Sequence, residues 1–432
     1  MKKALVIGGA RSGYGAACLL KDLDYDVTLV SRDDFDSRHV LEGMGVRVIL
    51  NDQDTDQFDD VDLVIKNPGI PNEHRLVKRF DKVYNEIDVA TQYHTKGTYY
   101  AISGTNGKTT TVTLLHEMLK RKDKDALLAG NVGFSLSEVL HHEKNTKRDV
   151  ALEISAFQME GTPNFKPHVY ALLNLTPDHL DRYESESHYY QAKLDIIPRA
   201  DIFIRNIDDE NIRKLTHKTE HTLDVSLVGD ADVYLKDDVI YFKSQPLFSK
   251  HDLKIVGDHN LFNATVSTVM AYLAGVKLEE IQSVLQEFKG VEHRLEYVDE
   301  IKGVAYYNDS KATNPESTYQ ALKAFDLKRV ILLAGGFDKK IHFNLLEEFS
   351  SQLKSIHLFG ESKSQMHETF PNATLHETMT EAFQYAHKKS KKGDIVLLSP
   401  ACASYDQFKD FEARGHQFKQ LVIGLITDKG TD

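Results

Sequence analysis

The segment Ser103–Thr111 reads Ser-Gly-Thr-Asn-Gly-Lys-Thr-Thr-Thr and directly follows the strand-like run Tyr99–Ile102. A strand, a glycine-containing turn and a helix in this order form one unit of a parallel α/β sheet, with the turn at the carboxyl edge. Gly104 and Gly107 let backbone N–H groups point inward at close range, and the helix from Val112 onward adds its positive N-terminal end. The segment therefore predicts both a parallel α/β fold and a cradle for phosphate.

Two side chains extend this cradle toward a nucleoside triphosphate. Lys108 can reach the terminal phosphates, and the Thr109 hydroxyl can ligate the accompanying Mg²⁺. The spacing is shorter than the usual pattern G-x-x-x-x-G-K-[ST], so the general motif is only partly matched and a solvated turn is the alternative. Because a strand precedes the loop and a helix follows it, we predict a protein that uses a nucleoside triphosphate.

Length and composition limit the classes open to the chain. Its 432 residues exceed what one core usually serves, which predicts two or three domains. A content of 41% hydrophobic and 27% charged residues is typical of a soluble globular protein. The formal net charge is −12 and no long basic run occurs, which argues against nucleic acid as the main partner. An anionic ligand must then be held by local lysines, arginines and helix ends.

The cysteines and the apolar runs indicate a cytoplasmic protein. Cys18 and Cys402 are the two cysteines of the chain, and they lie far apart without metal-ligand spacing, which suits a reducing compartment. The first apolar stretch is interrupted by glycines and Arg11, so we interpret it as a strand rather than a signal peptide. No apolar run approaches the roughly 18 residues that span a bilayer.

Short β-branched runs alternate with helical patterns along the whole chain, which predicts an α/β protein of three domains. We place a Rossmann-like domain at residues 1–95, a central domain of the P-loop ATPase type at 96–292 and a second Rossmann-like domain at 293–432. The strands expected in them are Ala4–Ile7, Val27–Val30, Val46–Ile49, Leu63–Ile65, Tyr99–Ile102, Asp149–Glu153, Tyr170–Leu175, Val304–Asn308, Val330–Leu333, Ser355–Phe359 and Ile395–Leu398, with a helix around Asn260–Ala274.

The turn Gly8–Gly13 follows the first strand and resembles a dinucleotide-binding fingerprint. Ala10 replaces the middle glycine of that fingerprint, and the acidic residue expected after the second strand is not cleanly placed in Ser31–Asp33. The turn predicts either a site for some nucleotide or a bare structural turn. The loop Asn67–Pro71 follows another strand, and its residues alone indicate only a rigid loop.

Acidic residues follow two strands of the central block. Glu153 ends the apolar run Val150–Leu152, at the sheet edge where an ATP-binding domain needs an Mg²⁺ ligand; the alternative is an N-cap of the next helix. Asp178, His179 and Asp181 crowd one turn after the next strand and offer ligands for metal or phosphate. A lone histidine is more often structural, but two flanking aspartates favour a functional role.

Three strand-end loops of the last block carry cations and hydroxyls. Lys311 and Thr313 lie in Asn308–Asn314, Lys339 follows a glycine pair, and Ser404 follows a further strand. Because the carboxyl ends of parallel strands meet at one edge of a sheet, we expect these groups to converge there. Two cations and two hydroxyls suit a small carboxylate ligand.

Together these motifs resemble the Mur ligase family of peptidoglycan synthesis, over nearly the whole chain and in the order of that family. The motifs are Gly-Thr-Asn-Gly-Lys-Thr-Thr, Glu-x-Ser-x-Phe-Gln, Asn-Leu-Thr-x-Asp-His-x-Asp-Arg, His-Asn-x-x-Asn-Ala, His-Arg-x-Glu and Asn-Asp-Ser-Lys-Ala-Thr-Asn. The stretch Ser399–Phe418, which contains Phe411-Glu412-x-Arg414-Gly415, is most similar to the branch of the family that adds D-glutamate.

The resemblance implies an ATP-dependent ligase that joins D-glutamate to UDP-N-acetylmuramoyl-L-alanine in the cytoplasm, as a monomer. ATP phosphorylates the carboxylate of the muramoyl substrate, and the amine of D-glutamate attacks the acyl phosphate. A free carboxylate and an amine do not condense readily in water, so activation by phosphate is the chemical need and electrostatic positioning is most of the catalysis. The implied cofactors are ATP, two Mg²⁺ ions and a carbamylated Lys193. From the residues alone, Lys193 is an ordinary surface lysine on a helix.

Motif by motif, the resemblance implies a role for each matching residue. The catalytic residues would be Lys108, Glu153, His179 and Lys193, and the metal ligands Thr109, Glu153, His179 and Lys193. ATP would be held by Gly104, Thr105, Asn106, Gly107, Lys108, Thr109, Thr110, Asn260, Asn263, Arg294 and Asp309. The muramoyl nucleotide would contact Arg11, Ser12, the Asn67–Pro71 loop, Asn131, Ser155 and Gln158. D-glutamate would contact Lys311, Thr313, Lys339, Ser404 and the backbone of Phe411.

Two positions depart from the family pattern. Ala156 stands where a second serine is usual, which is a mild change. Ser31–Asp33 lacks the clear aspartate expected to contact uracil or ribose, which affects the uridine contacts of the first domain.

Three other interpretations are open. A sister ligase of the Mur or folylpolyglutamate synthase type is disfavoured by the specific tail from Ser399. A non-catalytic nucleotide-binding homologue would have lost Lys108, Glu153, His179 or Lys193, and all four are present. An NAD-dependent oxidoreductase would leave the phosphate loop unexplained.

Overall fold

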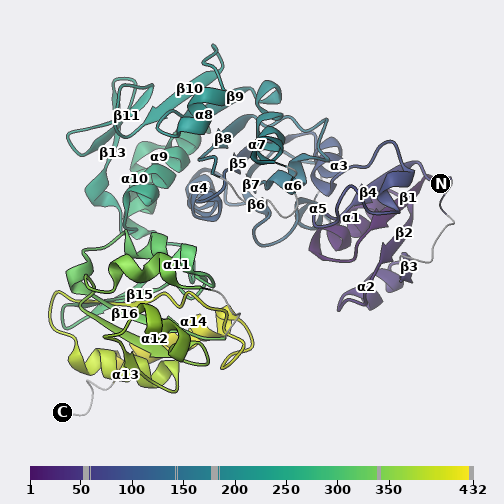
Figure 1. Cartoon of the computed structure of the whole chain (residues 1–432). Helices are drawn as coiled ribbons and strands as arrows, with labels where there is room; N and C mark the ends of the chain where they lie inside the picture. The colour runs from purple at the N-terminus through teal and green to yellow at the C-terminus, as the bar shows by residue number, and fades with distance from the viewer. Residues whose placement is uncertain are drawn as a thin grey trace. The chain divides into compact units, whose positions relative to one another are not determined.

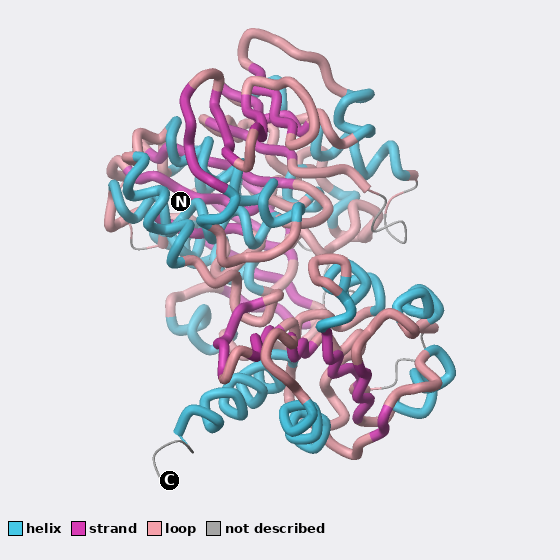
Figure 2. The backbone as a smooth tube through the Cα atoms, turned by 90° about the vertical axis from the view of Figure 1, so that its left-hand side faces the viewer, coloured by secondary structure: helices cyan, strands magenta, loops and turns pink. Residues whose placement is uncertain are grey.

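The computed structural model describes residues 1–51, 58, 60–141, 143, 145–176, 183, 185–337 and 342–427. Lys339 and His179, with the neighbouring Asp178 and Asp181, therefore lie outside the described residues. The chain divides into two units, Met1–Lys250 with Phe262–Val284 and His251–Leu261 with Leu285–Asp432. In both units strands alternate with helices (Figures 1 and 2). Within the described ranges, no helix is long and apolar enough to cross a bilayer.

The first unit begins with a four-stranded parallel sheet in the order β3-β2-β1-β4. Its elements are β1 (Lys3–Ile7), α1 (Arg11–Asp22), β2 (Asp26–Ser31), α2 (Arg38–Gly43), β3 (Arg47–Leu50), β4 (Leu63–Lys66), the 3-10 turn η2 (Val77–Arg79) and α3 (Glu86–Tyr93). The apolar residues Ala4–Ile7 are each at most 1% exposed, as expected for a strand covered on both faces. Gly13 is required in α1 because a Cβ there would collide with the carbonyl oxygen of Gly8.

A nine-stranded sheet follows in the same unit, in the order β13-β12-β11-β10-β9-β8-β5-β7-β6. The parallel strands are β5 (Gly97–Ser103), β6 (Leu127–Gly130), β7 (Arg148–Glu153), β8 (Val169–Leu172), β9 (Ile202–Asn206), β10 (Thr222–Ser226) and β11 (Val233–Lys236), and β12 (Val239–Phe242) and β13 (Gln245–Ser249) form an antiparallel edge. The helical segments of this unit are α4 (Lys108–Lys122), α5 (Leu136–Leu140), α6 (Ala156–Met159), α7 (Glu186–Leu194), η3 (Ile197–Arg199) and α8 (Glu210–Leu215). Three further segments, η4 (Lys250–Asp252), α9 (Asp258–Leu273) and α10 (Leu278–Glu287), are each divided between the two units. Because β5 pairs with β7 on one side and β8 on the other, the loop that leaves β5 is flanked by the ends of both strands.

The second unit contains a six-stranded sheet in the order β14-β15-β19-β16-β17-β18. Its strands are β14 (Glu296–Ile301), β15 (Val304–Asn308), β16 (Val330–Gly335), β17 (Ser355–Phe359), β18 (Thr374–Leu375) and β19 (Ile395–Leu398); only β14 is antiparallel to its neighbour among these described strands. Its helices are α11 (Pro315–Leu322), η5 (Leu327–Arg329), η6 (Asn344–Phe349), α12 (Lys363–Thr369), α13 (Met379–Lys389) and α14 (Phe411–Thr427). The loops after β15, β16 and β19 leave the same edge of this sheet, because the three strands are parallel neighbours.

Hydrogen bonds join the four-stranded sheet and its helices to the nine-stranded sheet. Arg11 donates from Nη1 to the carbonyl oxygen of Gly133 at 2.5 Å. Asp88 in α3 accepts from the backbone N–H groups of Asn164 and Phe165 at 2.7 and 3.0 Å. These bonds fix the first sheet against the loops that follow β6 and α6.

Glu86, the first residue of α3, makes the most deeply buried of these connections that we describe. Its side chain is fully buried, and Oε2 accepts the backbone N–H of Ser137 at 2.8 Å at the start of α5. The other oxygen, Oε1, has no hydrogen-bond partner among the described residues. Burial raises the pKa of Glu86 to about 7, although the bonds from Ser137 and Leu136 act in the opposite direction.

This raised pKa predicts a pH-dependent stability that Glu86→Gln should remove. Because the folded protein binds the Glu86 proton more tightly than the unfolded chain, this contribution is full below the ordinary pKa of 4.5 and is lost as the pH rises through about 7. Between pH 5 and 8, the free energy of unfolding should fall by on the order of 3 kcal/mol more in the wild type than in the variant. Urea titrations over this pH range measure the difference. The exposed Glu73→Gln control should follow the wild type, and parallel curves for Glu86→Gln and the wild type would contradict the expectation.

Candidate active site

The phosphate loop has the backbone geometry that its glycines predict. Gly104 and Gly107 have φ angles of +149° and +85°, a region that side chains with a Cβ rarely adopt. A Cβ on Gly107 would also collide with the side-chain amide of Asn263 in α9. Helix α4 begins immediately after this glycine, so its free N–H groups and positive end face the loop. Both glycines are therefore needed to let the backbone surround a phosphate group.

Lys108 and the surrounding polar residues hold the loop in place. Lys108 Nζ donates to the carbonyl oxygens of Gly104 and Thr105 at 2.9 and 2.8 Å, which places the ammonium group over the loop. Asn106 donates its backbone N–H to Asn174 Oδ1 at 2.8 Å, and Thr105 Oγ1 donates to the Thr176 carbonyl at 3.0 Å. The loop is thereby tied to the chain that leaves β8.

Helix α9 supports the first turn of α4. Ser267 Oγ donates to the Thr111 carbonyl at 2.8 Å, and Thr111 Oγ1 donates to the Gly107 carbonyl at 2.9 Å. Thr109 and Thr110 lie in the first turn of α4, next to these anchored residues. Asn263 lies against Gly107, so one residue expected to bind ATP does contact the phosphate loop.

Glu153 supplies an unpaired carboxylate oxygen beside this loop. It ends β7, which pairs with β5, and its side chain is 1% exposed. Oε1 accepts from Asn131 Nδ2 at 2.9 Å, while Oε2 is buried with no hydrogen-bond partner among the described residues. A buried carboxylate oxygen without a donor is costly unless a cation binds it, so the residue fits an Mg²⁺ ligand. The following helix α6 is capped by Ser155 rather than by Glu153, which removes the N-cap alternative.

Lys193 is buried, and its interpretation as an ordinary surface lysine is wrong. The residue is 1% exposed in α7, and Nζ donates to the Gly104 carbonyl at 3.1 Å and lies 4.7 Å from the centre of the Tyr189 ring. Its burial comes from the packing of α7 against other parts of the fold, including Gly104 of the phosphate loop and Tyr170 of β8, which the local sequence cannot reveal. Lys108 and Lys193 thus approach the same carbonyl group from two different helices.

The residues expected to contact the muramoyl nucleotide lie on the loops around Glu153. Asn131 follows β6 and is tied to Glu153 by a second bond, from its backbone N–H to the Glu153 carbonyl at 3.0 Å. Ser155 and Gln158 bond to each other, with Ser155 Oγ 3.0 Å from Gln158 Oε1. Arg11 and Ser12 lie in the first turn of α1.

The second unit holds a buried acid expected at the nucleotide. Asp309 follows β15; its Oδ2 accepts from Ser399 Oγ at 2.7 Å and its Oδ1 from the Leu295 N–H at 3.1 Å. Burial raises the pKa of Asp309 to about 7, while the neighbouring hydroxyl and Arg294 favour the ionised form. Asn260 in α9 donates to the Val256 carbonyl at 2.8 Å.

Arg414 joins two of the three strand-end loops of the second unit, the loop after β15 and the loop after β19. The loop after β16 meets the latter through the Phe337 N–H, which donates to the Ala403 carbonyl at 2.9 Å, and the expected position of Lys339 lies outside the described residues. The Arg414 guanidinium group donates to the carbonyl oxygens of Ser310, Cys402 and Ala403 at 2.8, 3.0 and 3.2 Å, and to Ser310 Oγ at 3.0 Å. Ser310 Oγ in turn donates to the Phe411 carbonyl at 2.8 Å. Arg414 lies within a motif of the sequence, but no role was predicted for it, because its partner Ser310 is 104 residues away in the chain.

The residues expected at D-glutamate lie on these same loops. Lys311 Nζ lies 5.1 Å from the centre of the Phe411 ring, and the backbone N–H of Thr313 donates to the Lys311 carbonyl at 2.9 Å. Ser404 is 2% exposed, one residue after the carbonyl that Arg414 holds. A lysine and two hydroxyls give this edge groups that bind carboxylates, whereas the start of α14 is already capped by Asp410, whose Oδ1 accepts the Ala413 N–H at 2.7 Å.

One further cluster of possible metal ligands does not fit a cation. Glu292, His293 and His416 bring three ligand atoms within 4.8 Å of one another. Asn308 donates to His293 Nδ1 at 2.9 Å, so the proton of the neutral imidazole lies on Nε2, which faces Glu292. Lys419 already pairs with Glu292 at 2.8 Å. The cluster is therefore a hydrogen-bonded ionic network.

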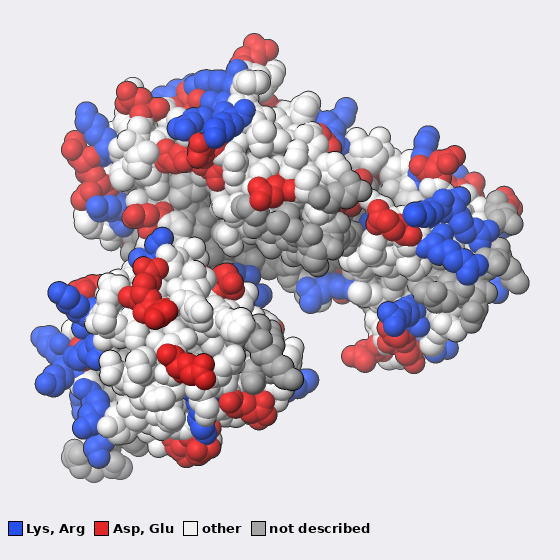
Figure 3. Space-filling view, viewed as in Figure 1, with Lys and Arg blue, Asp and Glu red and all other residues white. Residues whose placement is uncertain are grey.

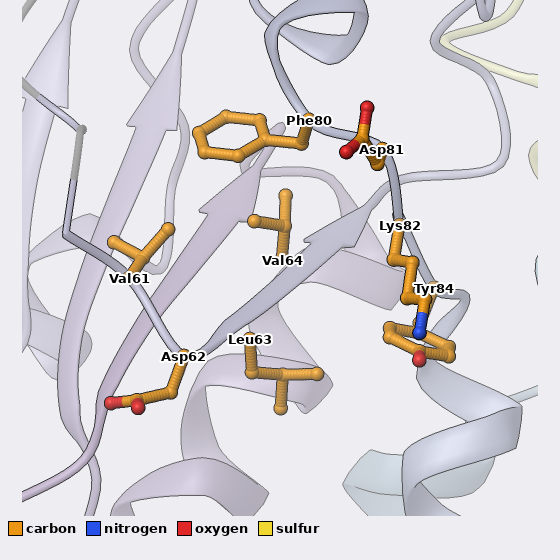
Figure 4. A pocket seen from close by; sticks show the side chains of 8 residues that line it. All are labelled: Val61, Asp62, Leu63, Val64, Phe80, Asp81, Lys82 and Tyr84. Atoms are coloured by element: carbon orange, nitrogen blue, oxygen red, sulfur yellow. The ribbon is translucent and has the colours of Figure 1, made fainter.

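Acidic and basic side chains are interspersed over the face shown in Figure 3. A cavity of about 300 Å³ lies at the amino-terminal start of β4, where Val64 lies below Phe80 and Asp81 stands beside Phe80 (Figure 4). The expected ligand contacts of this sheet, such as Arg11, follow the carboxyl ends of its strands, so the cavity is separate from them.

Comparisons with known proteins agree with this arrangement. Residues 102–271 match the Mur ligase middle domain, and residues 293–402 match the Mur ligase glutamate ligase domain. Relatives named UDP-N-acetylmuramoylalanine--D-glutamate ligase include those of Geobacillus sp. (strain WCH70), at 37% identity over 98% of this chain and 97% of the relative, and Bacillus subtilis (strain 168), at 36% over 97% and 96%. The relative from Listeria innocua is 36% identical over 99% of this chain and 97% of its own.

Solved structures agree at the level of the fold. The UDP-N-acetylmuramate-alanine ligase MurC of Thermotoga maritima is 18% identical and gives a TM-score of 0.61 over 98% of this chain and 100% of its own. A pseudomurein peptide ligase type C from Methanothermus fervidus is 17% identical, with a TM-score of 0.58 over 98% of this chain and 100% of its own. The predicted three-sheet α/β architecture is confirmed. With relatives above 30% identity that match along nearly their whole length, the chain belongs to the Mur ligase family.

Proposed function

We propose that this protein is the ATP-dependent ligase that joins D-glutamate to UDP-N-acetylmuramoyl-L-alanine. The three relatives described above, which match it over nearly the whole chain, carry the name of that ligase. The observation that carries the chemistry is the unpaired Glu153 oxygen beside a phosphate loop over which two lysines lie. A phosphate cradle with a buried anionic ligand suits phosphoryl transfer from ATP–Mg²⁺.

Two bond exchanges account for the reaction. The muramoyl-linked carboxylate attacks the γ-phosphorus of ATP, the bond to the bridging oxygen breaks, and ADP leaves. The neutral amine of D-glutamate then attacks the acyl carbon, phosphate leaves with the bonding electrons, and the nitrogen loses a proton to give the amide. Lys108, the glycine N–H groups and the start of α4 would stabilise the charge of the transferring phosphoryl group.

We propose that Thr109, Glu153, His179 and a carbamylated Lys193 hold the metal ions. Bound Mg²⁺ would neutralise phosphate charge during both exchanges. Lys193 is buried beside the loop, and addition of CO₂ to its neutral amine, with loss of one proton, gives a carbamate anion. The carbamate would replace a buried cation by a metal-binding oxygen anion. His179 lies outside the described residues, so its part rests on the family motif.

The substrates are assigned to the remaining loops. Arg11, Ser12 and the Asn67–Pro71 loop would take the UDP group, and Asn131, Ser155 and Gln158 the muramoyl group. Asn260, Asn263, Arg294 and Asp309 would hold the nucleoside of ATP, and Lys311, Thr313, Lys339, Ser404 and the Phe411 backbone would hold D-glutamate. We place the protein in the cytoplasm, where both nucleotide substrates are found, and propose that the monomer is active.

The test is phosphate release from ATP, Mg²⁺ and UDP-N-acetylmuramoyl-L-alanine, with D-glutamate, L-lysine or L-alanine offered in parallel. Release should require both D-glutamate and the muramoyl nucleotide. Release with another amino acid would assign the chain to a sister ligase and would mean that the roles of Lys339 and Ser404 are wrong. Tight ATP binding without release in any mixture would indicate a non-catalytic homologue.

A further inference from the structure

The loop between β6 and α5 exposes a large aromatic side chain beside the candidate active site. Phe134 is 61% exposed, whereas the next residues, Ser135 and Leu136, are fully buried. Scattered exposed apolar residues are common on protein surfaces, so exposure alone carries no argument. What matters is that Phe134 shares its loop with Asn131, an expected substrate contact, and directly follows Gly133, to which Arg11, a second expected contact, is bonded.

The backbone around Phe134 is held firmly on both sides. The Phe134 carbonyl accepts the N–H of Gly130 at 3.0 Å, which closes the loop on itself. Ser135 caps α5 through a bond from the Glu138 N–H to its Oγ at 3.3 Å. The aromatic ring is thus presented to solvent from a fixed position rather than from a free loop.

The same loop connects the two ends of the expected muramoyl site. Gly133, directly before Phe134, accepts the bond from Arg11, the residue expected to contact the UDP group. Asn131, three positions before Phe134, bonds to Glu153, the expected metal ligand. The substrate joins a diphosphate to the carboxylate that must reach the metal, so its sugar and lactyl arm have to pass along this loop.

We propose that Phe134 is a specificity-determining residue that packs against the apolar face of the muramoyl unit. A pyranose ring carries C–H groups on its faces, and the lactyl arm adds a methyl group; both are suited to contact with an aromatic ring. The contact buries apolar surface without using a hydrogen bond and recognises the sugar rather than the nucleotide. This inference rests on the proposed function.

Calorimetric titration of the full-length chain tests it with two ligands, UDP and UDP-N-acetylmuramoyl-L-alanine. Phe134→Ala should weaken binding of the muramoyl nucleotide by about tenfold and leave the affinity for UDP unchanged, whereas Phe134→Tyr should bind both like the wild type. Because the side chain is exposed, the unfolding midpoint of Phe134→Ala should stay that of the wild type. Val228→Ala, at a position 87% exposed in the same unit, is the matched control and should change neither affinity.

Two outcomes would overturn the assignment of Phe134. Equal affinity of Phe134→Ala and wild type for the muramoyl nucleotide would show that Phe134 does not contact this ligand. Parallel weakening for UDP and the muramoyl nucleotide would mean that the substitution disturbs the Arg11 contact instead. In both cases the wild type binds its substrate, so the proposed function stands; a wild type that does not bind the muramoyl nucleotide would overturn both.

Discussion

Lys193→Ala is expected to lower kcat by on the order of a thousandfold or more while leaving ATP binding largely intact. In the proposed mechanism, the carbamate on this side chain is a metal ligand. Its removal takes away one of the negative charges that bind Mg²⁺. Lys193→Arg should fail as well, because a guanidinium group stays charged and does not add CO₂. Phosphate release with saturating substrates, together with ATP titration, measures the two effects separately.

Chemical rescue separates a lost metal ligand from a damaged fold. Truncation of the buried Lys193 leaves space beside the Gly104 carbonyl that formate or acetate can occupy as a replacement anion. Partial recovery of Lys193→Ala activity with these acids, and none for Lys193→Arg, would support the carbamate. Lys120→Ala, at a partly exposed lysine of α4 that pairs with Glu117, is the control and should keep full activity. Near-normal turnover of Lys193→Ala would rule the role out.

Arg414→Ala should destabilise the second unit by on the order of 4 kcal/mol. The guanidinium group is fully buried, and its loss would remove its bonds to the carbonyl oxygens of Ser310, Cys402 and Ala403 from the interior of the unit; the Ala403 carbonyl would keep the N–H of Phe337. Burial lowers the pKa of Arg414 only to about 10, so the group stays charged at neutral pH and its bonds are of the stronger, charged type. Urea unfolding followed by circular dichroism measures the loss.

Arg414→Lys shows whether charge or geometry matters. A lysine keeps the charge but cannot place donors in a planar fork, so we expect it to recover less than half of the lost stability and to raise the KM for D-glutamate. Arg329→Ala is the matched control, because this exposed arginine of the same unit bonds to a single carbonyl, that of Gly393. A stability change for Arg414→Ala no larger than that of Arg329→Ala would contradict the expectation.

The parallel strands could be predicted because they are short, β-branched and buried on both faces. The prediction placed β1, β2 and β15 within about a residue of their ends, and the phosphate loop where β5 meets α4. The predicted strand Tyr170–Leu175 was too long. β8 ends at Leu172, and the following residues turn to bond with Ser103 and Asn206, which an apolar run does not indicate.

The antiparallel edge of the nine-stranded sheet was missed for a different reason. β11 and β12 are only four residues long each and are joined by Asp237 and Asp238, whose φ angles are +48° and +63°. Two residues with positive φ between short strands are typical of a tight hairpin, and aspartate tolerates this conformation. The aspartate pair was the available signal.

Some side chains of the site could be predicted from local sequence, and others could not. Gly107, Lys108 and Glu153 follow from local sequence, because a loop or strand end fixes what such residues can do. The burial of Lys193 and the bonds from Arg414 to Ser310 depend on chain segments 89 and 104 residues away, so no local pattern contains them. The division at residues 95 and 292 into three domains stays a prediction.

Helix α9 has a practical consequence for dissecting this chain. Its first turn belongs to the second unit and the remainder to the first, where Asn263 and Ser267 support the phosphate loop. A fragment ending at Lys250 would therefore be deprived of that support, and its ATP binding should be impaired even though every phosphate-loop residue is present. A nucleotide-binding fragment for crystallisation or ligand screening has to be assembled from sequence that is not contiguous, by fusing residues 262–284 to the end of the first segment.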